Sequence, residues 1–471
     1  MSWNSQRSDL RIQQHLQGMQ PINISGLTKE MDLEQAVSEN QCKRIYGVHV
    51  YALLTNFAHL ASSIPEGEAY KELIIAVHLY QREVVRIVEQ VFGGICVHFQ
   101  GPKLHALLYQ PFQDAQALAT RAVLLQFVLD EFVQSVFHEV FPRYRKTGIA
   151  SGADVGTTIA TSNGLKNDRE LLFLGSAANY AAKIIEPTDA SPRLTQRMID
   201  ALAEALPSPC SPVKTGLNLR VNSLRTPERN TLSRLLQAHD IRWRPADVKQ
   251  RLKQEKQELF SKPITMHAEA PLKNLRALSI HNNRRVFAAS LFADISGFTH
   301  YIERSEKTAK QVQALRVLHV IREEMATIVR LDFPGLRMQF QGDRVQALFV
   351  GEEQTVAQCA VDVAIGLQSA MEGPIKKCLP QAAPLHLAIG IDLGVTLVSR
   401  LGVHKYRDPI CLGQAVERAA AFEEASEAGQ IAVSRRLRRS LPEDIKSRFQ
   451  RDKGAHCYVA TDLTSLLMLS S

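Results

Sequence analysis

Two aspartates stand where strands of a predicted sheet end, and their positions suggest a metal-binding site. Asp294 closes the apolar run RRVFAASLFAD and is followed by a Ser-Gly turn. Asp343 follows a Gln-Gly pair at the tip of the hairpin predicted from LRMQFQGDRVQALFV. Two carboxylates placed in this way can hold a pair of divalent cations, which activate a hydroxyl and stabilise charge at phosphorus. The Ser-Gly turn opens a helix, whose free backbone N–H groups suit phosphates.

Each aspartate alone has a commoner structural role. Asp294 could cap the helix that follows it, and Asp343 could serve the hairpin turn. The presence of both carboxylates at the ends of neighbouring core strands favours the cation site over these structural roles.

The chain contains an internal repeat. Four pairs of segments match in the same order, at offsets of 241, 241, 238 and 238 residues. The matching segments are 53–60 with 294–301, 97–109 with 338–350, 152–160 with 390–398, and 174–184 with 412–422. The chain is therefore predicted to hold two diverged copies of one domain.

The elements that position the aspartates follow from hydrophobic periodicity. In the second copy the apolar patterns predict the order β-α-β-β-α-β with additions, an α+β core of the ferredoxin-like type. We expect two such domains in tandem. The predicted parts are a helical leader at 1–44, a first domain at 45–224, a charged helical connector at 225–285, and a second domain at 286–471.

Composition and charge are those of an ordinary globular protein. Of 471 residues, 45% are hydrophobic and 22% are charged. Lys and Arg exceed Asp and Glu by 56 − 48 = 8, which permits an anionic ligand such as a nucleotide without requiring nucleic acid. The basic run RRLRR at 435–439 has helical spacing and is expected to be a solvated face.

Cysteine usage and hydropathy indicate in which cellular compartment the protein is expected. The seven cysteines include no CxxC pair, so neither a disulfide framework nor a structural zinc site is expected. The N-terminus lacks the apolar core of a signal peptide, and no apolar run reaches the length of a membrane helix. We expect a soluble cytoplasmic protein without a membrane or nucleic-acid partner.

The segments FADISGFT and FQGDRVQALF, followed by a G…VN…A…R-type segment, resemble the class III nucleotidyl cyclase domain. Both copies carry the pattern, over most of 45–205 and 285–460. The resemblance implies two domains packed head to tail with a site at their interface, here an intramolecular pseudo-heterodimer. It also implies two bound Mg²⁺ or Mn²⁺ ions, and conversion of a nucleoside triphosphate to a 3′,5′-cyclic nucleotide and pyrophosphate.

The family's metal ligands match the second copy. There the resemblance assigns the metals to Asp294, Asp343 and the carbonyl of Ile295. The substrate-binding turn beside them comprises Ser296, Gly297, Phe298 and Thr299.

The family's ribose and phosphate contacts match the first copy. The family carries an Asn and an Arg four residues apart on a helix, and the first copy has Asn179 and Lys183 at these positions. Residues i and i+4 share one helix face. Lys offers a point charge where Arg offers a planar fork, so Lys183 would make fewer contacts. Arg400 and Lys214 are candidates to assist with the triphosphate.

The other four positions that are equivalent to these functional residues hold residue types that the family does not use there. In the first copy the metal positions hold Leu53 and Pro102, and in the second copy the Asn and Arg positions hold Glu417 and Ala421. The losses are complementary, so one composite site is complete and the other is expected to be inactive. The alternative is a pair of degenerate domains kept as a scaffold or nucleotide-binding sensor.

Two positions that read the base in the family hold His98 and Leu172. This pair matches neither the adenine nor the guanine set, although His98 could also be purely structural. In this the chain resembles the bacterial pyrimidine cyclases of the Pycsar antiphage systems. CTP is therefore the first expected substrate and UTP the second, with a purine (adenylate) cyclase as the alternative. The resemblance further implies a cyclic nucleotide messenger in antiphage defence, read by a separate effector. Because both halves lie in one chain, we expect a functional monomer.

Overall fold

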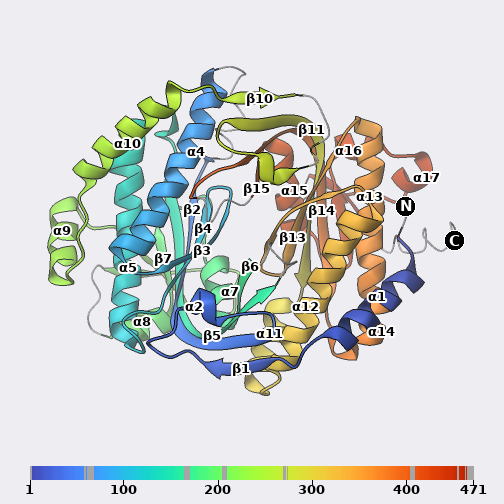
Figure 1. Cartoon of the computed structure of the whole chain (residues 1–471), viewed down its shortest axis with the longest axis horizontal. Coiled ribbons are helices and arrows are strands. Elements are labelled where there is room, and N and C mark those ends of the chain that lie inside the picture. Colours follow the sequence, from blue (N-terminus) through green and yellow to red (C-terminus); the bar gives the residue numbers. More distant parts are fainter. Residues whose placement is uncertain are drawn as a thin grey trace.

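The computed structural model describes residues 3–57, 60, 68–163, 170–203, 209–268, 272, 274–403, 409–452, 454, 456–461 and 463. These residues form two similar halves that lie side by side, each built on one mixed sheet (Figure 1). The predicted α+β class with two tandem domains is confirmed.

The first half is built on a sheet with the strand order β3-β4-β2-β5-β7-β9-β8, to which β1 and β6 are added at β2 and β5. Its strands are β1 (Asn23–Gly26), β2 (Gln41–Leu54), β3 (Ile95–Gln100), β4 (Lys103–Leu108), β5 (Ile149–Asn163), β6 (Glu170–Leu174), β7 (Pro192–Thr195), β8 (Cys210–Val213) and β9 (Val221–Leu224). Its helices are α1 (Ser5–Gly18), α2 (Leu33–Ala36), α4 (Glu68–Arg86), α5 (Ala115–Glu131), α6 (His138–Val140), α7 (Ser176–Lys183) and α8 (Gln196–Leu202). Helices α9 (Arg229–Ala238) and α10 (Pro245–Phe260) follow.

The second half repeats this order as β12-β13-β11-β14-β16-β18-β17, with β10 and β15 added at β11 and β14. Its strands are β10 (Thr265–His267), β11 (Asn282–Ser296), β12 (Leu336–Gln341), β13 (Arg344–Val350), β14 (His386–Arg400), β15 (Pro409–Leu412), β16 (Gln430–Val433), β17 (Gln450–Asp452) and β18 (Cys457–Thr461). Its helices are α11 (Phe298–Lys307), α12 (Gln311–Thr327), α13 (Glu353–Ala370), α14 (Lys376–Cys378), α15 (Gln414–Ala425), α16 (Arg435–Arg439) and α17 (Glu443–Lys446).

The equivalent long helices of the two halves end alike. Helices α4, α5, α12 and α13 each run into a π-helical turn; these turns are Ile87–Val91, Phe132–Phe137, Ile328–Asp332 and Met371–Ile375. Short 3₁₀ turns follow at Pro142–Tyr144 after α5 and at Pro380–Ala382 after α13, and a further one, Leu275–Ala277, lies between β10 and β11. The hairpins β3–β4 and β12–β13 both turn at a glycine of positive φ, Gly101 at 57° and Gly342 at 72°. The repeat therefore extends to backbone detail.

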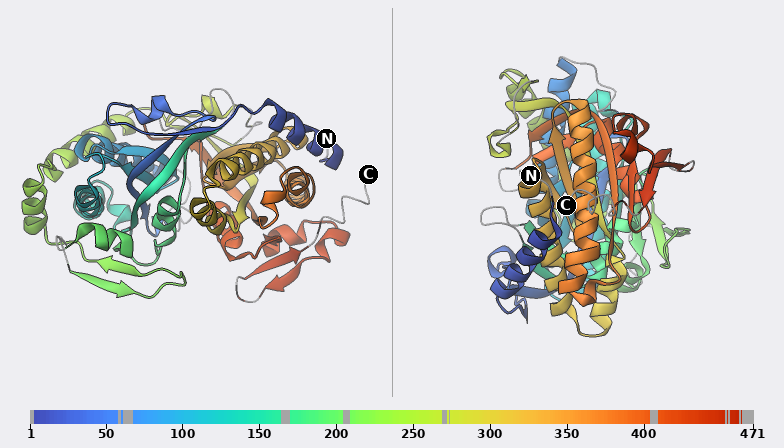
Figure 2. Two further views of the ribbon diagram at one scale, coloured as in Figure 1. Left: turned by 90° about the horizontal axis from the view of Figure 1, so that it is seen from below. Right: turned by 90° about the vertical axis from the view of Figure 1, so that its right-hand side faces the viewer.

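A helix and a short strand precede the sheet of each half, and together they contact both halves. Helix α1 packs on α12 and α13 of the second half, while β1 pairs in parallel with β2 of the first half (Figure 2). Helix α10 packs on α4 of the first half, while β10 pairs in parallel with β11 of the second half. The leader and connector segments predicted at 1–44 and 225–285 thus include strands as well as helices.

The hydrophobic cores of the two halves interpenetrate. Ile159, Leu172 and Leu174, from β5 and β6, are buried in the cluster formed mainly by the second half. Leu397 and Leu412, from β14 and β15, are buried in the cluster of the first half. Because burial of apolar surface drives association, this exchange fixes the two halves in one relative position.

No helix within the described parts of the chain is long and apolar enough to cross a bilayer.

Candidate active site

The two aspartates lie at the same end of adjacent strands. β11 and β13 pair in antiparallel register as far as Ala293 opposite Val345. Asp294 is the next residue of β11, and Asp343 lies in the turn that leads into β13. The sequence pattern therefore placed both carboxylates correctly with respect to each other.

The positive charges near Asp294 and Asp343 do not fully offset the cost of burying these two carboxylates. Burial raises the pKa of Asp294, although the charges of Arg344 and Lys183 act in the opposite direction. Burial and the charge of Asp294 raise the pKa of Asp343 well above its ordinary value. Among the described residues, neither carboxylate has an ion-pair partner within 4.0 Å. Two desolvated carboxylates that repel each other favour the binding of a cation.

The residues at this end of the sheet fit divalent cations. Carboxylate and carbonyl oxygens are the ligands that Mg²⁺ prefers, and Mg²⁺ is typically held by one or two carboxylates together with substrate phosphates. Within the described residues no group of three or more His, Cys, Asp and Glu side chains gathers as a metal cage. The side chain of Ile295 is buried in the core, so only its backbone carbonyl could contribute. The fit is therefore to cations shared between the two aspartates and a phosphorylated substrate.

The turn after Asp294 has the geometry of a helix start. Gly297 has a φ of 85° and precedes α11, a conformation that favours glycine. Ser296 and Thr299 are partly exposed, whereas the Phe298 side chain is buried among residues of the second core. Of the turn residues predicted to bind substrate, Phe298 could therefore contribute only its backbone.

Helix α7 brings the first half to this turn. Asn179 is partly exposed and Lys183, at the end of the helix, is exposed. The Lys183 ammonium donates a hydrogen bond of 2.7 Å to the Thr299 hydroxyl of the other half. The charge of Lys183 also lowers the pKa values of both Asp294 and Asp343. The structure thus brings Lys183 and the aspartate pair together across the interface.

Hydrogen bonds hold α7 against α11. The Ser176 backbone N–H donates to the Glu306 carboxylate at 3.0 Å, and the Tyr180 hydroxyl donates to Glu303. An acidic side chain at the N-terminus of a helix is stabilising, because the free N–H groups carry partial positive charge. These contacts set the position of Asn179 and Lys183 relative to the second half.

The opposite composite site lacks the required groups. In the first half Leu53, the equivalent of Asp294, pairs with Lys103 across β2 and β4, and its side chain offers no ligand to a cation. Pro102 lies in the β3–β4 turn. On α15, burial raises the pKa of Glu417 to about 7, and Ala421 is exposed.

The residue predicted to read the base lies in a group of aromatic rings, of which His49 and His105 are buried and His98 and Tyr51 are partly exposed. His98 makes an edge-to-face contact with His105 at 5.2 Å between ring centres. The ring of Tyr51 stacks on His105 at 4.1 Å, and His105 contacts His49 at 3.0 Å. Burial lowers the pKa of His98 to about 4. Leu172, the second predicted reader, is buried at the interface between the halves.

Two residues near the site were missed by sequence reasoning. The charge of Asp343 helps burial to raise the pKa of Tyr51, so this tyrosine of the first half lies within electrostatic range of Asp343. Arg344, next to Asp343, forms an ion pair of 2.8 Å with Glu423 of α15. The repeat offered a signal for Tyr51, because the equivalent position 241 residues later is Phe292, which lacks the hydroxyl.

Glu170 of the first half binds two arginines of the second. Its carboxylate accepts from Arg322 at 2.8 Å and from Arg337 at 2.9 Å. Arg322 also donates to the Gly342 carbonyl, beside Asp343. This group connects the β12–β13 turn with the start of β6, two residues before Leu172. These ion pairs hold the two halves together close to His98. The charge of Arg322 lowers the pKa of His98 further.

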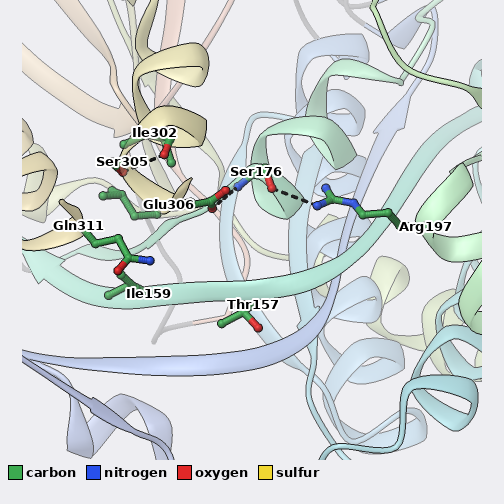
Figure 3. A pocket seen from close by; sticks show the side chains of 9 residues that line it. Thr157, Ile159, Ser176, Arg197, Ile302, Ser305, Glu306 and Gln311 are labelled. Carbon is green, nitrogen blue, oxygen red and sulfur yellow. Dashed lines mark hydrogen bonds between the residues drawn. The ribbon is translucent and has the colours of Figure 1, made fainter. Parts of the chain in front are cut away.

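A cavity of about 290 Å³ opens between the halves at the other end of α7. Figure 3 shows Glu306 and Arg197 approaching Ser176 from opposite sides of this cavity. Ser176 and Lys183 are seven residues apart on the helix, or about 10 Å at 1.5 Å per residue. The cavity is thus part of the same interface, displaced along α7 from the aspartate pair.

Arg400 and Lys214, the two residues suggested to assist Lys183, do not lie with it: Arg400 makes a hydrogen bond elsewhere, and Lys214 is far from Lys183 in the first sheet. Arg400 donates to the backbone carbonyl of Arg276 at 3.3 Å. Lys214 is exposed beyond β8, at the far end of the first sheet. Neither residue makes a described contact with Lys183 or the aspartates.

Comparison with known proteins places the second half in a family. Residues 283–461 match the family model described as "Adenylate and Guanylate cyclase catalytic domain". The resemblance to class III cyclases inferred from the sequence is therefore confirmed, and the second half carries such a domain.

Two proteins named "Uridylate cyclase" are similar over most of the chain. One, from Pseudomonas aeruginosa, is 29% identical over 439 residues, covering 88% of this chain and 81% of its own length. Another, from a Rhizobium species, is 25% identical over 433 residues, covering 86% of this chain and 80% of its own length.

A solved structure has the same fold throughout. It is the crystal structure of "a Class III adenylyl cyclase-like ATP-binding protein from Pseudomonas aeruginosa", with a TM-score of 0.83 and 23% identity over 99% of both chains. The tandem arrangement of two such domains is therefore shared with a protein of known structure.

Proposed function

We propose that this chain is a nucleotidyl cyclase with one composite active site, formed by the aspartate pair of the second half and by Asn179 and Lys183 of the first. The observation that carries the proposal is the position of Lys183. It bonds Thr299 beside the aspartates and interacts with both carboxylate charges, although it comes from the half that lacks metal ligands.

Each residue has a role that its chemistry supports. Two Mg²⁺ or Mn²⁺ ions held by Asp294, Asp343 and the Ile295 carbonyl would lower the pKa of the ribose 3′-hydroxyl and neutralise triphosphate charge. The N–H groups at the start of α11 suit the phosphates. Asn179 orients the ribose, and Lys183 stabilises the negative charge that develops at phosphorus.

The reaction is an internal substitution at phosphorus. The 3′-oxygen forms a bond to the α-phosphorus, the bond from that phosphorus to the bridging oxygen breaks, and pyrophosphate leaves with the electron pair. The proton of the 3′-hydroxyl passes to solvent. Positioning dominates such a reaction, because displacement of a reacting group by about 1 Å can cost on the order of 100-fold in rate.

We further propose a pyrimidine nucleotide as the substrate, with UTP ahead of CTP. The residues at the two base-reading positions, His98 and Leu172, match neither purine set, which supports a base pocket unlike those of the purine cyclases. The names of the two relatives similar over most of the chain favour uracil over cytosine. The rings of His98 and Tyr51 are partly exposed and pack on the buried His105, so they are the members of this group that could contact a base.

The experiment is to incubate purified protein separately with ATP, GTP, CTP and UTP in the presence of Mn²⁺ or Mg²⁺ and to identify the products by mass. We expect cyclic UMP as the main product and pyrophosphate in equal amount. The Asp294→Ala variant is the control and should form neither. A purine cyclic nucleotide as the main product would refute the pyrimidine assignment, and no cyclic product under any condition would refute the cyclase.

A non-catalytic nucleotide sensor is the second candidate, and Lys183 in place of the family Arg favours it. A sensor would bind a nucleoside triphosphate, shown as a rise in the unfolding midpoint, without turnover over hours. Binding with product formation excludes this candidate.

The proposal extends to a monomeric enzyme that produces a second messenger for antiphage defence. Because both parts of the site lie in one chain, activity per molecule should stay constant on dilution. The messenger role requires that cells carrying the chain with its neighbouring genes accumulate the cyclic nucleotide on phage infection. Lysates compared by mass, with Asp294→Ala as control, test this.

A further inference from the structure

A second hollow lies entirely within the second half and contains an unusual concentration of arginine. It has a volume of about 790 Å³, within the range of sites for small molecules. Four of the residues that line it are Arg418 of α15 and Arg435, Arg436 and Arg439 of α16. We call it the arginine hollow. None of its lining residues belongs to the proposed active site.

The positive charge of the arginine hollow is only half neutralised. Arg418 pairs with the buried carboxylate of Asp392 at 2.5 Å, and Arg436 pairs with Glu353 at 2.6 Å. Arg435 and Arg439 are exposed and have no acidic partner within 4.0 Å in the described part of the chain. Two guanidinium groups are therefore left available to a ligand.

The fold itself does not require these two arginines. The internal repeat places α8 where the second half has α16, and both helices are capped by a hydroxyl, Thr195 or Ser434. Counting from these caps, Gln196 and Asp200 of the first half occupy the positions of Arg435 and Arg439. There the Gln196 amide donates to the Asp200 carboxylate at 2.9 Å.

The second half carries an unfavourable pair where the first half has a favourable one. Like charges at i and i+4 of a helix destabilise it, whereas the Gln–Asp contact supports it. Such a difference is consistent with a function that needs the charge. The guanidinium fork matches phosphate geometry, since it can donate two parallel hydrogen bonds.

We infer that the arginine hollow binds the phosphate chain of a small oligophosphate anion. Nucleoside di- and triphosphates and inorganic polyphosphates share this chemistry. A ligand with two or more linked phosphates matches two unpaired guanidinium groups better than a single phosphate does. The hollow is concave and limited in size, which favours a small molecule over an extended nucleic-acid backbone.

The test titrates inorganic tripolyphosphate into the full-length protein by calorimetry, at about 150 mM salt and without divalent cations. A Lys183→Ala background weakens binding at the proposed active site. The test variant is Arg435→Gln/Arg439→Asp, which installs the residues of the first half and so keeps a helix that the fold accepts. The matched control is Arg234→Gln/Arg242→Asp, which makes the same change at two exposed positions around α9.

We expect the test variant to weaken tripolyphosphate binding by at least about tenfold and the control to leave it within about twofold. Orthophosphate should bind much more weakly than tripolyphosphate. A nucleoside triphosphate that binds more tightly than tripolyphosphate would identify a nucleotide as the source.

Three results would overturn the inference. The first is an equal loss in the control, which would indicate a general effect of net charge. The second is the absence of binding in the Lys183→Ala background. The third is tighter binding of a short single-stranded oligonucleotide than of tripolyphosphate, which would make the hollow part of a nucleic-acid surface.

Discussion

The Lys183 ammonium of the first half donates a 2.7 Å hydrogen bond to the Thr299 hydroxyl of the second half, 116 residues later in the chain. This contact joins the end of α7 to the start of α11, beside Asp294. Lys183 is exposed, so only part of its hydrogen-bonding capacity is used. A phosphorylated substrate could take the remaining donors without breaking the contact between the halves.

Lys183→Ala should lower kcat by about 100-fold or more, because one preorganised donor to a developing charge contributes about 3 kcal/mol. Lys183→Arg should retain most of the activity, since the family carries Arg at this position. Steady-state turnover with saturating Mn²⁺ measures both variants. The exposed Lys29→Ala is the control, and a Lys183→Ala enzyme with full activity would contradict the composite site.

Asp343→Asn should abolish turnover and, without metal, make the protein more stable. Burial and the charge of Asp294 raise the pKa of Asp343, so its ionised form opposes folding. An uncharged amide removes this penalty, and the unfolding midpoint should rise by a few degrees. Mn²⁺ should raise the midpoint of the natural chain and leave that of the variant unchanged. An equal Mn²⁺ shift in both proteins would exclude Asp343 as a ligand.

Changes at the second composite site should have little effect. Glu417→Ala and Leu53→Asp should each leave turnover within about twofold, since a single substitution does not complete that site. Asn179→Ala is the comparison and should lose at least about 100-fold, because ribose orientation depends on it. If Glu417→Ala were as damaging as Asn179→Ala, the active unit would instead be a dimer of two second halves.

Three histidines whose pKa values are lowered by desolvation should make the protein less stable in mild acid. Burial lowers the pKa of His49 to about 3 and of His98 to about 4, and that of His105 lies well below its ordinary value. Between about pH 6.5 and 4 the unfolded chain therefore binds protons that the folded chain excludes. The free energy of unfolding should fall as pH falls through this window, by about 1.4 kcal/mol per pH unit for each histidine.

Urea unfolding at several pH values measures this slope. His49→Ser, which installs the residue found 241 positions later at Ser290, should reduce the slope by about one proton. The exposed His239→Ser is the control and should not change it. A slope that is unchanged in His49→Ser would contradict the buried neutral state of this imidazole.

Arg11→Met should destabilise the protein by roughly 3 kcal/mol, because Arg11 neutralises two carboxylates that are almost fully buried. Its guanidinium contacts Glu324 at 2.5 Å and Asp332 at 2.8 Å, whose side chains are 4% and 3% exposed. Arg251 makes the equivalent contact with Glu83 at 2.6 Å. Without Arg11, Asp332 keeps Arg7 at 2.9 Å, but Glu324 keeps no ion-pair partner among the described residues. Arg251→Met should cost less, since Glu83 keeps Arg86 at 3.1 Å. Thermal unfolding of the two variants measures their losses of stability. Equal losses in Arg11→Met and Arg251→Met would contradict the expected difference.

Most of the fold could be predicted from the sequence because the signals are local or repeated. Alternating apolar runs and glycine turns located the hairpins β3–β4 and β12–β13, and the near-constant offset showed that one domain occurs twice. The same local signals placed Asp294 and Asp343 at neighbouring strand ends. The Asn179–Lys183 spacing put both residues on one helix face.

The sequence by itself thus determined the two domains, the acidic pair and the loss of the same residues in the other copy. Only the tertiary structure decided what crosses from one half to the other. Residues more than 100 positions apart are joined by the contact of Lys183 with Thr299, the ion pair of Arg11 with Glu324 and the ion pair of Arg322 with Glu170. No periodicity in a sequence encodes such pairs, because they depend on the packing of two complete cores against each other. The same holds for the arginine run at 435–439, which the sequence predicted to be only a solvated face. Its arginines line the arginine hollow together with residues of α13 and α15, and these helices meet the run only in the folded chain.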